Sequence, residues 1–132
     1  MGNTCAVRLT RYYRASPSEV WAALTDAASI ARWLGPASDV DLSLGGTLEL
    51  RLHDRVVLTA RVQAMEVERT LELDWAAPGE EPSVVRFELK PDDDGTIVTL
   101  DHRLIDARFG MRAMSLWERH LARLDALLGE MR

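Results

Sequence analysis

The spacing of apolar residues predicts an N-terminal strand followed by two short helices. Residues 6–13 alternate in polarity, as a strand with one buried face does. Ser16 and Pro17 form a typical helix start, with a capping side chain and a proline in the first turn. Asp26 can cap a second helix, which should end before Pro36 because proline disfavours helical dihedral angles in the preceding residue. The apolar positions of the two helices are Val20, Trp21 and Leu24, then Ile30, Trp33 and Leu34.

A period of two then predicts a run of strands. Leu48, Leu50 and Leu52 alternate with polar residues, and similar alternation covers residues 56–67, 71–75, 85–90 and 96–104, so that these segments and the first strand make six. The apolar parity changes within residues 56–67, so we expect a bulge or bend there and a strongly curved sheet. The sequence Asp-Asp-Asp-Gly at residues 92–95 predicts a tight hairpin turn.

From Gly110 onward the apolar spacing becomes helical. A meander of strands followed by one long amphipathic helix should fold the helix onto the sheet, because neither element can bury its apolar side alone. We therefore expect an α+β fold in which a curved antiparallel sheet wraps around the C-terminal helix, in a single domain over residues 1–132. The apolar stripe of that helix is formed by Met114, Trp117, Leu121, Leu124, Leu128 and Met131.

Composition and charge narrow the range of partners. The net charge is -5 and the basic residues are scattered, so nucleic acid is not an expected partner. No apolar stretch approaches the roughly 18 residues that a membrane span needs. The first residues lack the basic and apolar segments of an export signal, which makes the cytoplasm the expected location. Cys5 is the sole cysteine, so no internal disulfide can form.

Motifs for metal or cofactor chemistry do not emerge from the sequence. The three histidines show no metal-ligand spacing, and the acidic run at residues 92–94 suits a hairpin better than a calcium loop. Ser83 and Ser115 lack the glycine-framed turn of a nucleophilic serine. We therefore expect no metal and no cofactor.

Several segments together resemble a known superfamily. They are SPSEVWAALTD at residues 16–26, ARWLGP at 31–36, the Gly45-Gly46 turn, the strand ending in Trp75, SVVRFELKPDDDGT at 83–96 and VTLDH at 98–102. The chain resembles the START-like superfamily, also called SRPBCC or polyketide cyclase-like, and within it the bacterial branch related to the activator of heat-shock-protein ATPase. The resemblance implies a helix-grip fold of order β-α-α-β6-α with an internal apolar cavity. One departure is Leu116, where many relatives place glycine.

A sheet bent around a helix leaves a cavity where its inward side chains do not fill the concave side. Parity selects the lining, with the alternative that these residues fill an ordinary core. Burial of roughly 300 Å² of apolar ligand surface would gain about 7 kcal/mol before association costs, which suits micromolar binding in a preorganised pocket. The predicted lining is Trp33 near the entrance, with Leu50, Leu52, Leu73, Phe87, Leu89, Val98, Leu100, His102, Met114, Trp117 and Leu121.

The histidines differ in their expected positions. His102 shares parity with Leu100 and Leu104, which directs it inward, either to bond a ligand oxygen or act as a base, or to be a core histidine satisfied by the backbone. His53 should face solvent, as should Arg51 on the same strand, and His120 is expected on the surface beside the helical stripe.

These features support one leading function and two alternatives. The leading hypothesis is binding of a small hydrophobic molecule, such as a lipid, polyketide or aromatic metabolite, between the sheet and the C-terminal helix. The resemblance also allows a cyclase or dehydratase that uses the same cavity, with His102 as the inward titratable group. A co-chaperone that stimulates a heat-shock ATPase is the other alternative. An exposed edge strand would allow a homodimer.

Overall fold

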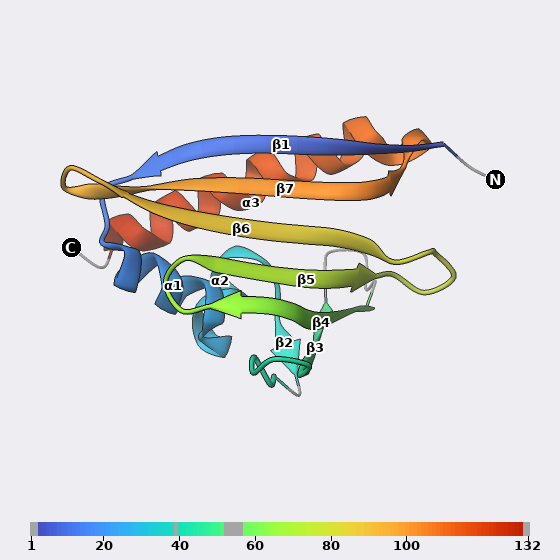
Figure 1. Cartoon of the computed structure of the whole chain (residues 1–132), viewed down its shortest axis with the longest axis horizontal. Helices are drawn as coiled ribbons and strands as arrows, with labels where there is room; N and C mark the ends of the chain where they lie inside the picture. Colours follow the sequence, from blue (N-terminus) through green and yellow to red (C-terminus); the bar gives the residue numbers. More distant parts are fainter. Residues whose placement is uncertain (1–2, 39, 52–56, 131–132) are drawn as a thin grey trace.

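The computed structural model describes residues 3–38, 40–51 and 57–130. Within these residues, seven antiparallel strands form one curved sheet in the order β1-β7-β6-β5-β4-β3-β2 (Figure 1). The predicted α+β class and the β-α-α-β6-α order are confirmed. The elements are β1 Thr4–Tyr13, α1 Pro17–Thr25, α2 Ala27–Trp33, β2 Ala37–Ser38, β3 Thr47–Arg51, β4 Val57–Glu66, β5 Thr70–Ala76, β6 Ser83–Asp92, β7 Gly95–Asp106, the 3-10 helix η2 Ala107–Phe109, and α3 Gly110–Glu130.

Local sequence signals set the starts of α1 and α2. The Ser16 hydroxyl accepts a bond from the Glu19 backbone N–H at 3.1 Å, and Glu19 Oε1 accepts one from the Ser16 N–H at 2.9 Å. This reciprocal capping satisfies two helix-end donors that would otherwise lack intrahelical partners. Asp26 Oδ2 accepts from the Ser29 N–H at 3.0 Å and caps α2. Both predicted helix starts are therefore confirmed.

The strands follow the predicted alternation, and one further strand, β2, is present. Pairing between β4 and β5 shifts register between Val62 and Ala64, which confirms the bulge expected from the change of parity. The two-residue strand β2 was not located by alternation, because Ala37 and Ser38 are too few to show a period. It pairs antiparallel with β3, with Ala37 opposite Leu50 and Ser38 opposite Glu49.

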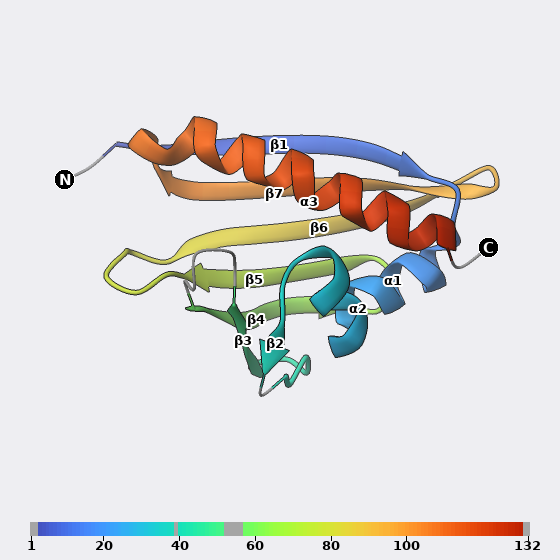
Figure 2. The ribbon, with the colours of Figure 1, turned by 180° about the vertical axis from the view of Figure 1, so that it is seen from behind.

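Helix α3 lies along one face of the sheet, across β1 and β7 toward β6 (Figure 2). The expectation that His120 lies on the surface is wrong, since only 7% of its surface is exposed. Its ring packs edge-on against Trp117, with ring centroids 5.6 Å apart. The buried face of α3 is wider than the predicted stripe because the helix sits in a concave sheet, which covers residues on both sides of the stripe. Leu127 is buried for the same reason.

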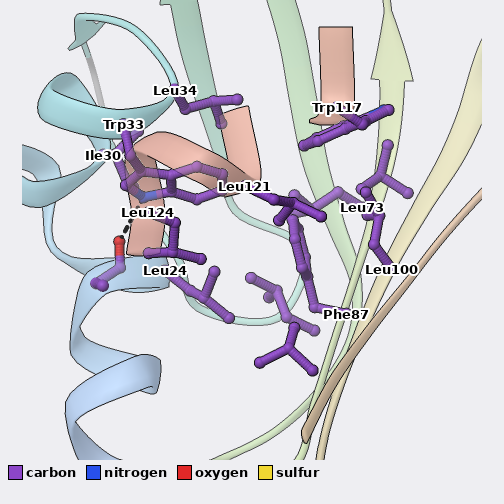
Figure 3. Packing of buried hydrophobic residues seen from close by; sticks show 14 of the residues in the cluster. Leu24, Ile30, Trp33, Leu34, Leu73, Phe87, Leu100, Trp117, Leu121 and Leu124 are labelled. Atoms are coloured by element: carbon purple, nitrogen blue, oxygen red, sulfur yellow. Dashed lines mark hydrogen bonds between the residues drawn. The ribbon is translucent and has the colours of Figure 1, made fainter. Parts of the chain in front are cut away.

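Buried residues of α2, α3 and the middle strands of the sheet pack together in the core (Figure 3). Phe87 packs edge-to-face with Trp33 and with Trp117, at centroid separations of 6.2 and 6.0 Å. The Trp33 Nε1–H donates to the Ala23 carbonyl at 2.9 Å, so the one polar atom of this ring is satisfied while the ring is buried.

Candidate functional site

A pocket of about 560 Å³ lies at the end of the sheet where α3 begins. Its wall comes from the start of β1, the first residues of β4 and β6, the last residues of β5 and β7, the loop between β5 and β6, the helix η2, and the first two turns of α3. Such a volume is within the range of sites for small organic molecules. The large apolar side chains in its wall are Leu58, Trp75, Leu104, Ile105, Phe109 and Leu116.

Most of the lining predicted from parity lies beside this pocket, in the core. His102 is in the pocket wall, and Leu52 lies outside the described residues, as do His53 and Met131. Met114 is half-buried against the core. The core cluster holds the others, among them the Trp33 that was expected near the entrance, so whether a ligand reaches them stays a prediction. They are Trp33, Leu50, Leu73, Phe87, Leu89, Val98, Leu100, Trp117 and Leu121.

The predicted list lacks several residues of the pocket wall. Trp75 shares parity with Leu71 and Leu73, so alternation carried a signal for it. Phe109 precedes α3 in the short helix η2, where no period marks an inward side. Parity shows which side chains face inward, but it does not show where the concave side is filled.

Hydrogen bonds fix the orientation of His102 and its protonation. The Trp117 Nε1–H lies 2.9 Å from His102 Nδ1. Because an indole nitrogen can only donate, Nδ1 accepts and carries no proton. The neutral ring therefore holds its proton on Nε2, which is 2.7 Å from the Ser83 hydroxyl oxygen and donates to it. The Ser83 hydroxyl in turn donates to the Trp75 carbonyl at 3.1 Å.

Burial keeps His102 uncharged at neutral pH. The ring is only 7% exposed, and desolvation lowers the pKa of its imidazole to about 4. The His102 side chain points inward, as the sequence predicted. Its hydrogen-bond partners are the side chains of Ser83 and Trp117, whereas a core histidine was expected to bond the backbone. Since Nε2 donates to Ser83 and Nδ1 is occupied by Trp117, neither nitrogen has a free lone pair with which to accept a proton from a substrate or from the serine.

A bulge in β7 places a strained leucine in the pocket wall. Cys5 pairs with Ile105 but Val7 pairs with His102, so two β7 residues oppose one β1 residue. The bulge turns Leu104 out of the face it was expected to share with His102: it is 52% exposed, and Ile105 is buried in its place. Leu104 has φ of 61°, a left-handed conformation that is unfavourable for a residue with a Cβ.

Exposed charged side chains of both signs form the rim of the pocket. Arg108 binds Asp106 at 2.7 Å, and hydrogen bonds from the arginine side chain lower the pKa of that carboxyl to about 2. Glu80 and Glu81 come from the loop between β5 and β6, and Arg112 from α3. The rim therefore has no single sign of charge, in contrast to the apolar wall below it.

The described residues hold neither a metal-binding cluster nor a helix that could span a membrane. Across residues 3–38, 40–51 and 57–130, no group of three or more His, Cys, Asp or Glu side chains is placed to hold a metal ion. Among the helices of these ranges, none combines the length and apolarity needed to span a bilayer.

Comparison with known proteins establishes the family. The family model described as Activator of Hsp90 ATPase homolog 1-like protein matches residues 14–129. The chain belongs to this family. The resemblance drawn from the sequence, to the bacterial branch of SRPBCC proteins related to this activator, is thereby confirmed. No curated protein matches the sequence.

Solved structures share the fold of this family member over nearly the whole chain. Protein MLL2253 from Mesorhizobium loti is 25% identical with a TM-score of 0.90, covering 97% of this chain and 99% of that one. CalU16 from Micromonospora echinospora is 27% identical with a TM-score of 0.82, covering 93% and 75%. DynU16, from the dynemicin biosynthetic locus, is 23% identical with a TM-score of 0.86, covering 94% and 47%, and shows similarity of fold alone.

Proposed function

We propose that the protein binds a small lipophilic molecule, such as a lipid, polyketide or aromatic metabolite, in the pocket at the start of α3. The observation that carries this proposal is a pocket of about 560 Å³ with aromatic and aliphatic side chains in its wall. Water in such a hollow makes few hydrogen bonds, so an apolar ligand gains free energy by replacing it.

Binding without catalysis is favoured by the state of His102. This residue was the candidate base of a cyclase or dehydratase, but its two nitrogens are engaged by Ser83 and Trp117. Co-chaperone activity is suggested by the family name alone. A homodimer stays a prediction, and the edge strands β1 and β2 are where another chain could pair.

Filling the pocket tests the proposal. Ala113 is half-buried in the pocket wall, whereas Ala122 lies on the exposed side of the same helix. Ala113→Trp should lower the affinity for the neutral probe N-phenyl-1-naphthylamine at least about ten-fold, because the indole occupies the volume that the probe needs. Ala122→Trp should leave the affinity unchanged. Fluorescence titration measures both, after circular dichroism has shown that each variant is folded. Equal affinities for the two variants would contradict the proposed site.

Relieving the strain at Leu104 should separate stability from binding. Asparagine tolerates a left-handed backbone, so Leu104→Asn is expected to raise the free energy of unfolding by about 1 kcal/mol. The same change removes apolar surface from the pocket and should weaken probe binding about three-fold. Urea unfolding and probe titration measure the two effects.

A second residue with positive φ provides the control. Glu68 has φ of 64° in the turn between β4 and β5, away from the pocket wall. Glu68→Asn should therefore stabilise the protein by a similar amount without any change in probe affinity. If Leu104→Asn binds the probe as tightly as the wild type, Leu104 does not contribute to the ligand site.

A further inference from the structure

The floor of the pocket carries two buried polar side chains, Ser83 and His102. They are 8% and 7% exposed, and both are in the pocket wall. A buried polar group that meets a ligand affects specificity more than an apolar wall does, because a ligand that leaves it unsatisfied loses affinity. The hydrogen-bonding capacity that remains on these two side chains therefore decides which polar group a ligand can present there.

The existing bonds leave only one kind of capacity. A serine hydroxyl has one donor and two acceptor positions. The Ser83 donor is used by the Trp75 carbonyl, and one acceptor position is used by the Nε2–H of His102. His102 has no capacity left, since its Nδ1 accepts from Trp117. What remains is one acceptor position on the Ser83 oxygen.

We infer that the pocket selects lipophilic ligands that present a neutral hydroxyl, as a phenol or alcohol does, to the oxygen of Ser83. This inference rests on the proposed function. An ether or ketone of the same shape offers only acceptors and would face the serine lone pair. A carboxylate also offers only acceptors, and its burial adds the cost of desolvating a charge. An ammonium group can donate, but its burial has the same cost of desolvation.

The polarity of the floor is fixed by the residues behind it. For Ser83 to donate to a ligand instead, its hydroxyl must give up the bond to the Trp75 carbonyl. For His102 to donate instead, its ring must turn, which takes Nδ1 away from the indole N–H of Trp117. Each rearrangement leaves a buried polar group without this bond. Trp117 therefore acts as a positioning residue that holds the histidine proton on the side of the serine.

Two probes with the same ring system test the inference. We expect the wild type to bind 2-naphthol more tightly than 2-methoxynaphthalene in calorimetric titrations, and the ratio of affinities should fall about five-fold or more in Ser83→Ala. In that variant the His102 Nε2–H loses its acceptor, so a ligand that supplies an acceptor, such as the ether, is favoured. Ser83→Thr keeps the oxygen and should keep the preference. Thr96→Val is the matched control, because it removes a buried hydroxyl that bonds the Ala15 carbonyl outside the pocket.

A spectroscopic measurement on the unmodified protein tests the hydrogen-bond direction without any variant. Nitrogen-15 NMR should show the proton of His102 on Nε2, and a proton on Nδ1 would overturn the inference. So would an equal ratio of the two probe affinities in the wild type and Ser83→Ala. The failure of the proposed function is different: neither probe binds, or both bind as well after Ala113→Trp.

Discussion

Replacing Trp117 by alanine is expected to lower the free energy of unfolding by about 4 kcal/mol. The ring is buried and stands at the centre of an aromatic cluster, with centroids 5.6 Å from Trp75 and 6.0 Å from Phe87. The substitution creates a large cavity and removes the donor to His102. Since small domains are stable by about 5–15 kcal/mol, the loss is a large part of the total. Urea unfolding followed by circular dichroism measures it.

Two further variants divide this effect into parts. Trp117→Phe keeps a ring but removes the N–H, and should cost about 1–3 kcal/mol, mainly through the buried His102 nitrogen that loses its donor. Trp21→Ala is the control for removing an indole from a half-buried position against the core, and should cost less than Trp117→Ala. Equal losses for Trp21→Ala and Trp117→Ala would show that the aromatic cluster has no special weight in stability.

Acidification below about pH 6.5 should destabilise the protein through His102. The pKa of His102 is about 4 in the folded protein and near 6.5 in an unfolded chain, so between these values the unfolded state binds more protons. The contribution of His102 to the free energy of unfolding is therefore fully present above about pH 6.5. It falls by about 3 kcal/mol in total as the pH drops toward 4. Denaturant titrations at a series of pH values measure the slope.

Glutamine at position 102 isolates the contribution of this histidine. Its amide can donate and accept but does not titrate, so His102→Gln should flatten the stability profile between pH 6.5 and 4. His120→Gln is the matched variant at the other buried histidine of the described residues. The carboxyl groups of Asp94 and Asp106 have lowered pKa values, so their contributions are lost only below this range. A profile unchanged by His102→Gln would contradict the assignment.

The fold could be predicted because its signals are local. The Ser16 cap, the Asp26 cap and the parity change in β4 each depend on a few neighbouring residues, and each has the predicted structural result. A two-residue strand such as β2 has no such signal. His120 is buried because the sheet curves far enough around α3 to cover it, and the helical period of the sequence does not show how far the sheet curves.

The site was less predictable because it combines distant segments. Alternation placed His102 on the inward side, but Ser83 and Trp117 became its partners only through the pairing of β6 with β7 and the docking of α3. Because of the bulge, Ile105 is buried and Leu104 is exposed, the reverse of what alternation predicts. Neither leucine nor isoleucine is a sequence signal for a bulge. A pocket is the space that packing leaves, so its place follows from the whole fold.

The pairing of β1 with β7 has a consequence for the order of events during synthesis. Thr4 pairs with Asp106, and Tyr13 with Thr96, so β1 leaves a ribosome well before the strand that it pairs with has been synthesised. Pairing across so long a separation is slow to form, since a large loop must close first. Until then the apolar side of β1 is open to solvent and to other nascent chains, so we expect protection by chaperones to matter for this strand during synthesis.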